Sequence, residues 1–213
     1  MAKNINIDEV LELLASTKKV DLKKGINLAT KNQIELTNDF LYQILSNSIN
    51  DEKFWESNVQ IIDYFGITQY EKSEKILDSV CIKNEPHSMV TMSSAQALCR
   101  IKKTSDSDIL EVNRLLSFGN FSVVNGVLKF LGQDEIIPNS ELEMKKIIDK
   151  VNNFEPKYEK GYSDVRVGLA LACSLWPKLD FVKDFLNNCL LSSYNPLVRV
   201  ATNSLKDKRT NIG

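Results

Sequence analysis

The chain has 213 residues, 43% hydrophobic and 26% charged, which suits one compact domain or a short repeat array with a substantial core. Its 27 basic and 28 acidic residues give a net charge of −1, without the basic excess that nucleic-acid-binding proteins usually show. No apolar run approaches the ~20 residues that cross a bilayer, and the N-terminus lacks the apolar core of a signal peptide, so we expect a cytoplasmic protein.

Helical periodicity begins near the N-terminus and continues along the chain. Apolar residues recur at intervals of three and four, for example Val10 and Leu14, whereas alternation of apolar and polar residues is almost absent. In chain order, the predicted helices are 7–16, 20–30, 33–47, 51–66, 69–82, 85–101, 106–117, 119–133, 140–152, 161–175, 179–191 and 194–208. Because no low-complexity linker or shift in composition separates them, we expect a single all-α domain over 1–213.

Several of these helices begin alike, which indicates an internal repeat. Val90, Val123, Val165 and Val198 take equivalent places at spacings of 33, 42 and 33 residues, and Ser57 takes that place 33 residues before Val90. Each such first helix is followed by a second helix. The predicted unit is therefore helix–turn–helix, repeated about five times with a half-unit at the C-terminus, and the units must stack to bury their apolar faces.

Small residues follow the repeat valines, among them Ala95, Ala97, Gly126 and Gly168. Their density predicts that successive first helices approach each other closely. The wider spacing of 42 residues marks an insertion of about nine residues, which we expect to form a polar loop near 152–163 that projects from one edge.

The start of the repeat, acid–Pro–x–x–x–Val–Arg–x–x–Ala–x–x–Ala–Leu, resembles HEAT repeats, in particular the short type of phycobilisome lyases. Pro86 and Val90 match it in one copy, and Val165 and Arg166 match it in another. The resemblance is clear over 85–206 and weaker over 1–84. It implies an α-solenoid of about five HEAT-like repeats, in which the second helices line the concave surface and the arginine pairs with an acid of a neighbouring turn.

Residue types that catalytic and metal sites commonly need are scarce. His87 is the single histidine, which removes most zinc sites and Ser–His–Asp triads, and no glycine-rich phosphate loop occurs. The cysteines form no CxxC pair and are expected to be core thiols: Cys81, Cys99, Cys173 and Cys189. The sequence therefore predicts no catalytic residue, no metal site and no cofactor.

The predicted second helices carry more acidic than basic residues. On a concave surface they would suit a basic protein partner and would steer its association. The residues expected to bind that partner are Asp39, Tyr42, Glu71, Glu74, Asp78, Asp108, Glu111 and Arg114. The favoured function is a non-enzymatic protein-binding module. A concrete version is a bacterial immunity protein that neutralises a basic nuclease toxin, since some immunity proteins are HEAT-like.

The same resemblance keeps other functions open. Alkylpurine DNA glycosylases are built from HEAT-like repeats and hold DNA in a concave face that carries tryptophans. An acidic groove would repel phosphates, and Trp55 and Trp176 lie in or next to first helices, which we expect on the convex side, so nucleic acid is disfavoured. Either tryptophan could pack internally or anchor a partner. A scaffold or lyase-like subunit that handles a bilin is the third function.

Overall fold

The computed structural model describes residues 6–159 and 161–210, and these consist of helices and the turns that join them. The α-helices are α1 (Ile7–Leu14), α2 (Lys19–Lys31), α3 (Asn38–Ser48), α4 (Trp55–Thr68), α5 (Glu74–Lys83), α6 (Met89–Lys102), α7 (Leu110–Leu116), α8 (Phe121–Gln133), α9 (Glu141–Asn152), α10 (Arg166–Ala172), α11 (Asp180–Leu190) and α12 (Asn195–Ser204). Short 3-10 helices, η1 (Glu35–Thr37), η2 (Glu52–Phe54) and η3 (Glu71–Ser73), precede α3, α4 and α5. The predicted all-α class is confirmed, and no helix in these ranges combines the length and apolar character that a membrane crossing requires.

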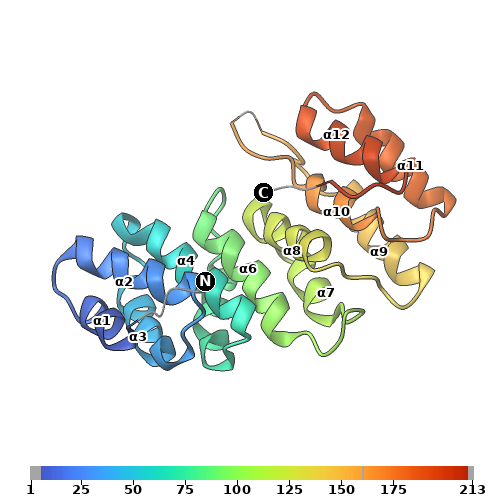
Figure 1. Cartoon of the computed structure of the whole chain (residues 1–213). Helices are drawn as coiled ribbons and strands as arrows, with labels where there is room; N and C mark the ends of the chain where they lie inside the picture. The colour runs from blue at the N-terminus through green and yellow to red at the C-terminus, as the bar shows by residue number, and fades with distance from the viewer. Residues whose placement is uncertain (1–5, 160, 211–213) are drawn as a thin grey trace.

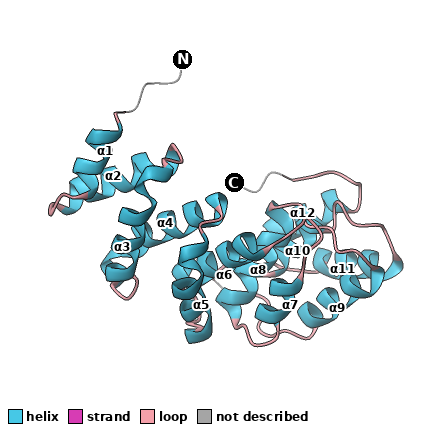
Figure 2. Cartoon of the chain, turned by 90° about the horizontal axis from the view of Figure 1, so that it is seen from below, coloured by secondary structure: helices cyan, strands magenta, loops and turns pink. Residues whose placement is uncertain are grey.

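The helices form two rows, and both rows are curved. Helices α2, α4, α6, α8, α10 and α12 make one row, in which each member packs directly against the next. Helices α3, α5, α7, α9 and α11 make the other row, and α1 packs against α2. The first set follows the inner arc and the second set follows the outer arc (Figures 1 and 2), so we call them the inner row and the outer row.

Small residues bring the inner-row helices together, as the repeat pattern predicts. A Cβ added at Gly66 of α4 would lie 2.9 Å from Ala97 Cα in α6, and one added at Gly168 of α10 would strike the backbone at Leu128 of α8. Gly126 of α8 lies equally close to the backbone of α6. Contacts between successive outer-row helices are sparser. A double row with shorter spacing on one side bends toward that side, which explains the curvature.

The expectation that the second helices line the concave surface is wrong. In both views the second helices occupy the outer arc (Figures 1 and 2), and the helices that carry the repeat valines occupy the inner arc. The reason is physical, because the small residues lie in the first helices and only that row can be closely spaced. The acidic residues of the second helices therefore lie on the convex side.

Two hydrophobic clusters fill the space between the rows, and they meet at α6. Cys99 belongs to the C-terminal cluster, whereas Leu98 belongs to the N-terminal one. Residues 91–99 of α6 are all buried, because α4 and α8 cover its two sides. Trp176 is 2% exposed and its indole Nε1 donates to the Ile136 carbonyl oxygen at 2.9 Å, so this tryptophan packs internally.

Ion pairs between arginine and an acidic residue stabilise some of the turns, but the partner of the arginine differs between the predicted repeats. Arg166 pairs with Asp164 of its own turn, and Asp164 is fully buried. Arg100 pairs with Asp134 after the next inner-row helix, with Nη2 2.8 Å from Oδ2. Arg199 is exposed, and no ion pair to it occurs among the described residues.

The polar insertion lies between α9 and α10, where Figure 1 shows an extended loop. Glu159 and Tyr162 of this loop contact the residues at the N-terminal ends of α6 and α8. Tyr162 stacks on His87 with ring centroids 4.1 Å apart, and His87 Nε2 lies 3.1 Å from a carboxylate oxygen of Glu159. The insertion therefore covers part of the inner row in addition to projecting from it.

Candidate functional site

Three of the predicted partner-binding residues form one cluster on the outer row. The Arg114 guanidinium lies between Asp78 and Glu111, and Lys102 lies 3.4 Å from Glu111. The hydrogen bonds to Glu111 raise the pKa of Arg114 further above its usual range. Glu111 is 9% exposed, so this cluster links α5, α6 and α7 and offers little uncompensated charge to a partner.

A second group of predicted residues surrounds Tyr70. The Tyr70 hydroxyl donates to Asp39 at 2.8 Å, and Lys72 Nζ lies 3.0 Å from the same oxygen. The tyrosine hydrogen bond is the main cause of the lowered pKa of Asp39. Tyr42 meets the Tyr70 ring edge-on at 6.4 Å between centroids. Asp39 and Tyr42 are thus neighbours, and the carboxylate is already paired.

The remaining predicted residues lie apart from these groups or face mixed charge. Asp108 accepts backbone N–H bonds from Leu110 at 3.0 Å and from Thr104 at 3.1 Å, which fixes the turn before α7 and lowers the pKa of Asp108. Glu71 and Glu74 line a shallow hollow together with Asp78 of the first cluster, and three lysines line the same hollow. The eight predicted residues therefore do not form one acidic groove.

The inner row has a different charge pattern. Within its six helices, nine residues are basic and three are acidic. Some of these charges are neutralised, as in the pair of Lys23 and Glu56 at 3.1 Å. Gln96 of α6 donates to Gln133 of α8 at 2.7 Å, which adds a polar link across the row.

Asp63 of α4 and Lys129 of α8 are partly buried charges on either side of α6. Burial raises the pKa of Asp63, and the Ser93 hydroxyl, Arg100 and Lys129 oppose that rise. Burial also lowers the pKa of Lys129, against the attraction of Asp63. Neither side chain takes part in an ion pair within 4.0 Å among the described residues. Charged side chains whose burial disfavours the charged form are more common at functional sites than elsewhere. The inner row is therefore a better candidate surface than the outer row.

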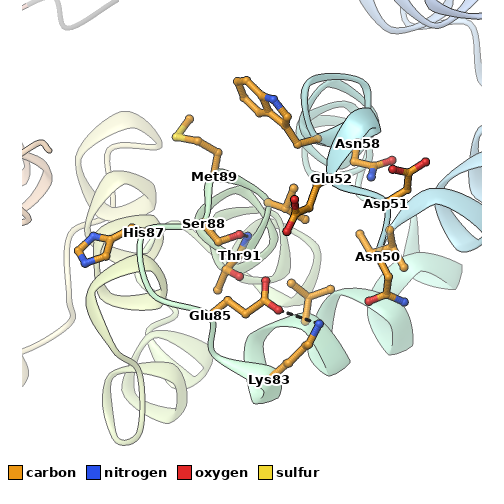
Figure 3. A pocket seen from close by; sticks show the side chains of 14 residues that line it. Asn50, Asp51, Glu52, Asn58, Lys83, Glu85, His87, Ser88, Met89 and Thr91 are labelled. Carbon is orange, nitrogen blue, oxygen red and sulfur yellow. Dashed lines mark hydrogen bonds and ion pairs between the residues drawn. The ribbon is translucent and has the colours of Figure 1, made fainter. Parts of the chain in front are cut away.

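A hollow lies at one edge of the two rows, between the N-terminal ends of α4 and α6. We call it the α4–α6 pocket; its volume is about 450 Å³. Figure 3 shows its walls, which include Asp51, Glu52, Trp55, Glu85, Met89 and Thr91. Trp55 and Met89 are each 46% exposed, so two large apolar side chains lie open at this pocket.

Some polar groups of the α4–α6 pocket have hydrogen-bond or ion-pair partners within the chain, and others have none among the described residues. Glu85 pairs with Lys83 at 2.7 Å, and Asn58 is held by two hydrogen bonds to Ser48. Thr91 is 1% exposed, and its hydroxyl has no hydrogen-bond partner within the described ranges. A buried hydroxyl without a partner is uncommon in folded proteins, so Thr91 marks a place where a ligand could complete the bonding.

A smaller hollow of about 210 Å³ lies beside the first, between α6, α8 and the insertion loop. Its walls include Phe121, Lys129 and Tyr162, and it shares His87 and Met89 with the α4–α6 pocket. In Figure 3 the His87 ring points away from the α4–α6 pocket. The two hollows therefore form a continuous uneven surface along the start of three inner-row helices.

The thiols are poorly placed for chemistry. All four cysteines are buried and free, and burial raises the pKa of Cys81 and of Cys189 to about 12. In the described ranges no three His, Cys, Asp or Glu side chains converge as a metal site would require.

Comparison of the chain with protein-family models, curated proteins and solved structures gave no match. The HEAT-like character consequently remains an interpretation of the residue pattern, and function must be argued from the surface itself. Sequence reasoning considered Trp55 as an anchor but missed Asp63 and Lys129. For Asp63 the available signal was the helical register, since it follows Trp55 at a spacing of eight residues on α4.

Proposed function

We propose that the chain is a short α-solenoid of HEAT-like helix pairs that acts as a non-enzymatic protein-binding module. Its partner would contact the α4–α6 pocket, at the edge of the inner row, and not the second helices. The observation that carries this proposal is the exposure of Trp55 and Met89, each 46%, at the rim of one preformed pocket. Tryptophan is enriched among residues that dominate binding energy, and an exposed apolar pair beside a hollow suits an inserted side chain.

The charge around the pocket favours a basic partner. Asp51, Glu52 and Glu85 line it, and Lys83 is the lysine among its lining residues. An acidic rim around an apolar anchor attracts a basic segment and rejects an acidic one. A bacterial immunity protein that holds a basic nuclease toxin is one concrete form of this function.

The test is identification of a partner by affinity purification and mass spectrometry, followed by calorimetry with the purified partner. We expect Trp55→Ala to weaken binding about 30-fold, which corresponds to the ~2 kcal/mol of an interface anchor. The matched control is Glu74→Lys on the outer row, which should leave the affinity unchanged. Loss of binding in Glu74→Lys with full binding in Trp55→Ala would refute the inner-row proposal and favour the convex acidic residues.

A second candidate is a DNA-binding protein, including an enzyme of the alkylpurine DNA glycosylase type. It is favoured by the nine basic residues of the inner-row helices and by the inner-row position of Trp55 and Asp63. Duplex DNA binding at moderate salt that weakens in Lys129→Gln, or release of an alkylated base, would support it. The bilin-handling scaffold needs an accessible cysteine, whereas all four thiols are buried.

A further inference from the structure

We infer that the α4–α6 pocket recognises the guanidinium group of an arginine side chain. This inference rests on the proposed function, because it names the group that a protein partner would insert. The pocket supplies the three elements that arginine recognition uses, which are carboxylates without a cation, an acceptor at depth and an aromatic face.

The carboxylates are Asp51 and Glu52, in the turn before α4. Both are exposed, and neither pairs with a cation within 4.0 Å among the described residues, in contrast to Glu85, which is paired with Lys83. Asp51 uses Oδ1 to accept the Lys53 backbone N–H at 2.9 Å, which leaves its second oxygen available. In Figure 3, Glu52 extends toward the space inside the pocket.

The acceptor at depth is the Thr91 hydroxyl. It lies in the wall formed by α6, is buried, and has no hydrogen-bond partner in the described ranges. A threonine hydroxyl has two acceptor lone pairs, and a guanidinium carries five N–H donors in one plane. A guanidinium therefore has enough N–H groups for both Thr91 and a carboxylate, whereas an ammonium group is a single point of charge.

The aromatic face is the indole of Trp55, which lines the pocket and is 46% exposed. Guanidinium groups stack on tryptophan more readily than ammonium groups do. Met89 lies in the opposite helix and can cover the aliphatic part of an arginine side chain. The His87 ring points away from this space (Figure 3), so the nearby imidazole does not face the ligand.

The experiment uses N-acetyl-arginine amide as the probe and the two indole N–H signals of the ¹⁵N-labelled chain as the readout. Trp55 is exposed, whereas the Trp176 indole is buried and bonded to Ile136, so the signals report on different places. We expect the probe to shift the Trp55 signal in a saturable manner and to leave the Trp176 signal in place. N-acetyl-citrulline amide has nearly the same shape without the charge and should not bind.

Glu52→Gln keeps the shape of the pocket and removes one charge, so it should weaken binding of the probe about tenfold. Glu71→Gln, in η3 before the outer-row helix α5, is the matched control and should bind like the wild type. Equal shifts with citrulline, stronger binding of N-acetyl-lysine amide, or equal binding by Glu52→Gln and the wild type would each overturn the inference.

Failure of this inference and failure of the proposed function give different results. If an identified partner binds through Trp55 but the arginine probe does not bind, the function stands and the arginine site is refuted. If the probe binds as expected but every protein partner is insensitive to Trp55→Ala, the arginine site stands and the proposed function is refuted.

Discussion

Close packing of the inner row can be tested by adding one methyl group. A Cβ at Gly126 of α8 would lie 2.1 Å from the Met92 carbonyl oxygen of α6, and it would also lie 3.0 Å from Ala95 Cβ. Real Cβ atoms essentially never approach within 3.0 Å of a neighbour, so Gly126→Ala forces the two helices to separate by about 0.9 Å. The obstacle is backbone and cannot rotate away, unlike the end of a flexible side chain.

The expected loss follows from two opposing terms. Overpacking of a core costs ~1–3 kcal/mol, and the upper end applies here because the obstacle is backbone. Alanine recovers ~1 kcal/mol through its higher helix propensity. The net loss is about 2 kcal/mol, which lowers the melting temperature of a domain of this size by about 4–8 °C.

Urea denaturation followed by far-UV circular dichroism measures this loss, with an unchanged slope showing that the unfolded state is the same. Ser79→Ala on the exposed side of α5 is the control, because it improves helix propensity at a solvent-exposed position. It should be neutral or slightly stabilising. If Gly126→Ala proved as stable as the control, α6 and α8 would not be closely packed, and the explanation of the curvature would fail.

Three further predictions concern buried charge and thiols. Asp134→Asn should cost ~1–3 kcal/mol in urea titrations, because Arg100 and Asp134 form a charge-assisted pair with side chains only 15% and 17% exposed; an unchanged midpoint would contradict this. Burial raises the folded-state pKa of Asp63 above its ordinary 3.8, which applies in the unfolded chain. The wild type therefore loses stability as pH rises from 3.8 to the folded-state pKa. Asp63→Asn should therefore melt at a higher temperature at pH 7 and at the same temperature below pH 3.8, and a lower melting temperature at pH 7 would refute the desolvation argument. The Cys99 pKa is raised well above its ordinary value by burial, so thiol reagents should label the cysteines only on unfolding, and rapid labelling of the native chain would contradict their burial.

Much of the fold could be predicted because an amphipathic helix shows in the spacing of apolar residues within a short segment. The recurrence of apolar residues at intervals of three and four positions predicted every α-helix of the described ranges. The helix expected over 161–175 is α-helical only at Arg166–Ala172. The small residues at Gly126 and Gly168 were predicted to permit close stacking, and their backbone contacts confirm it. The insertion was predicted as a polar loop, but nothing in its sequence showed that Tyr162 would stack on His87.

The candidate site was less predictable, because it depends on which row faces inward. The acids chosen from the second helices, such as Asp78 and Glu111, lie on the outer row and are largely paired within the chain. The position of Trp55 in a first helix was known from the sequence, but its exposure beside a pocket was not.

Periodicity and residue size are properties of short segments, so the sequence by itself determined the helices and the places where they approach closely. The direction of curvature, and with it the surface available to a partner, depends on the difference in spacing between two rows. That difference is set jointly by residues far apart in the chain, such as Gly66 with Ala97 and Gly168 with Leu128. Only the tertiary structure could therefore decide that the inner surface belongs to the first helices.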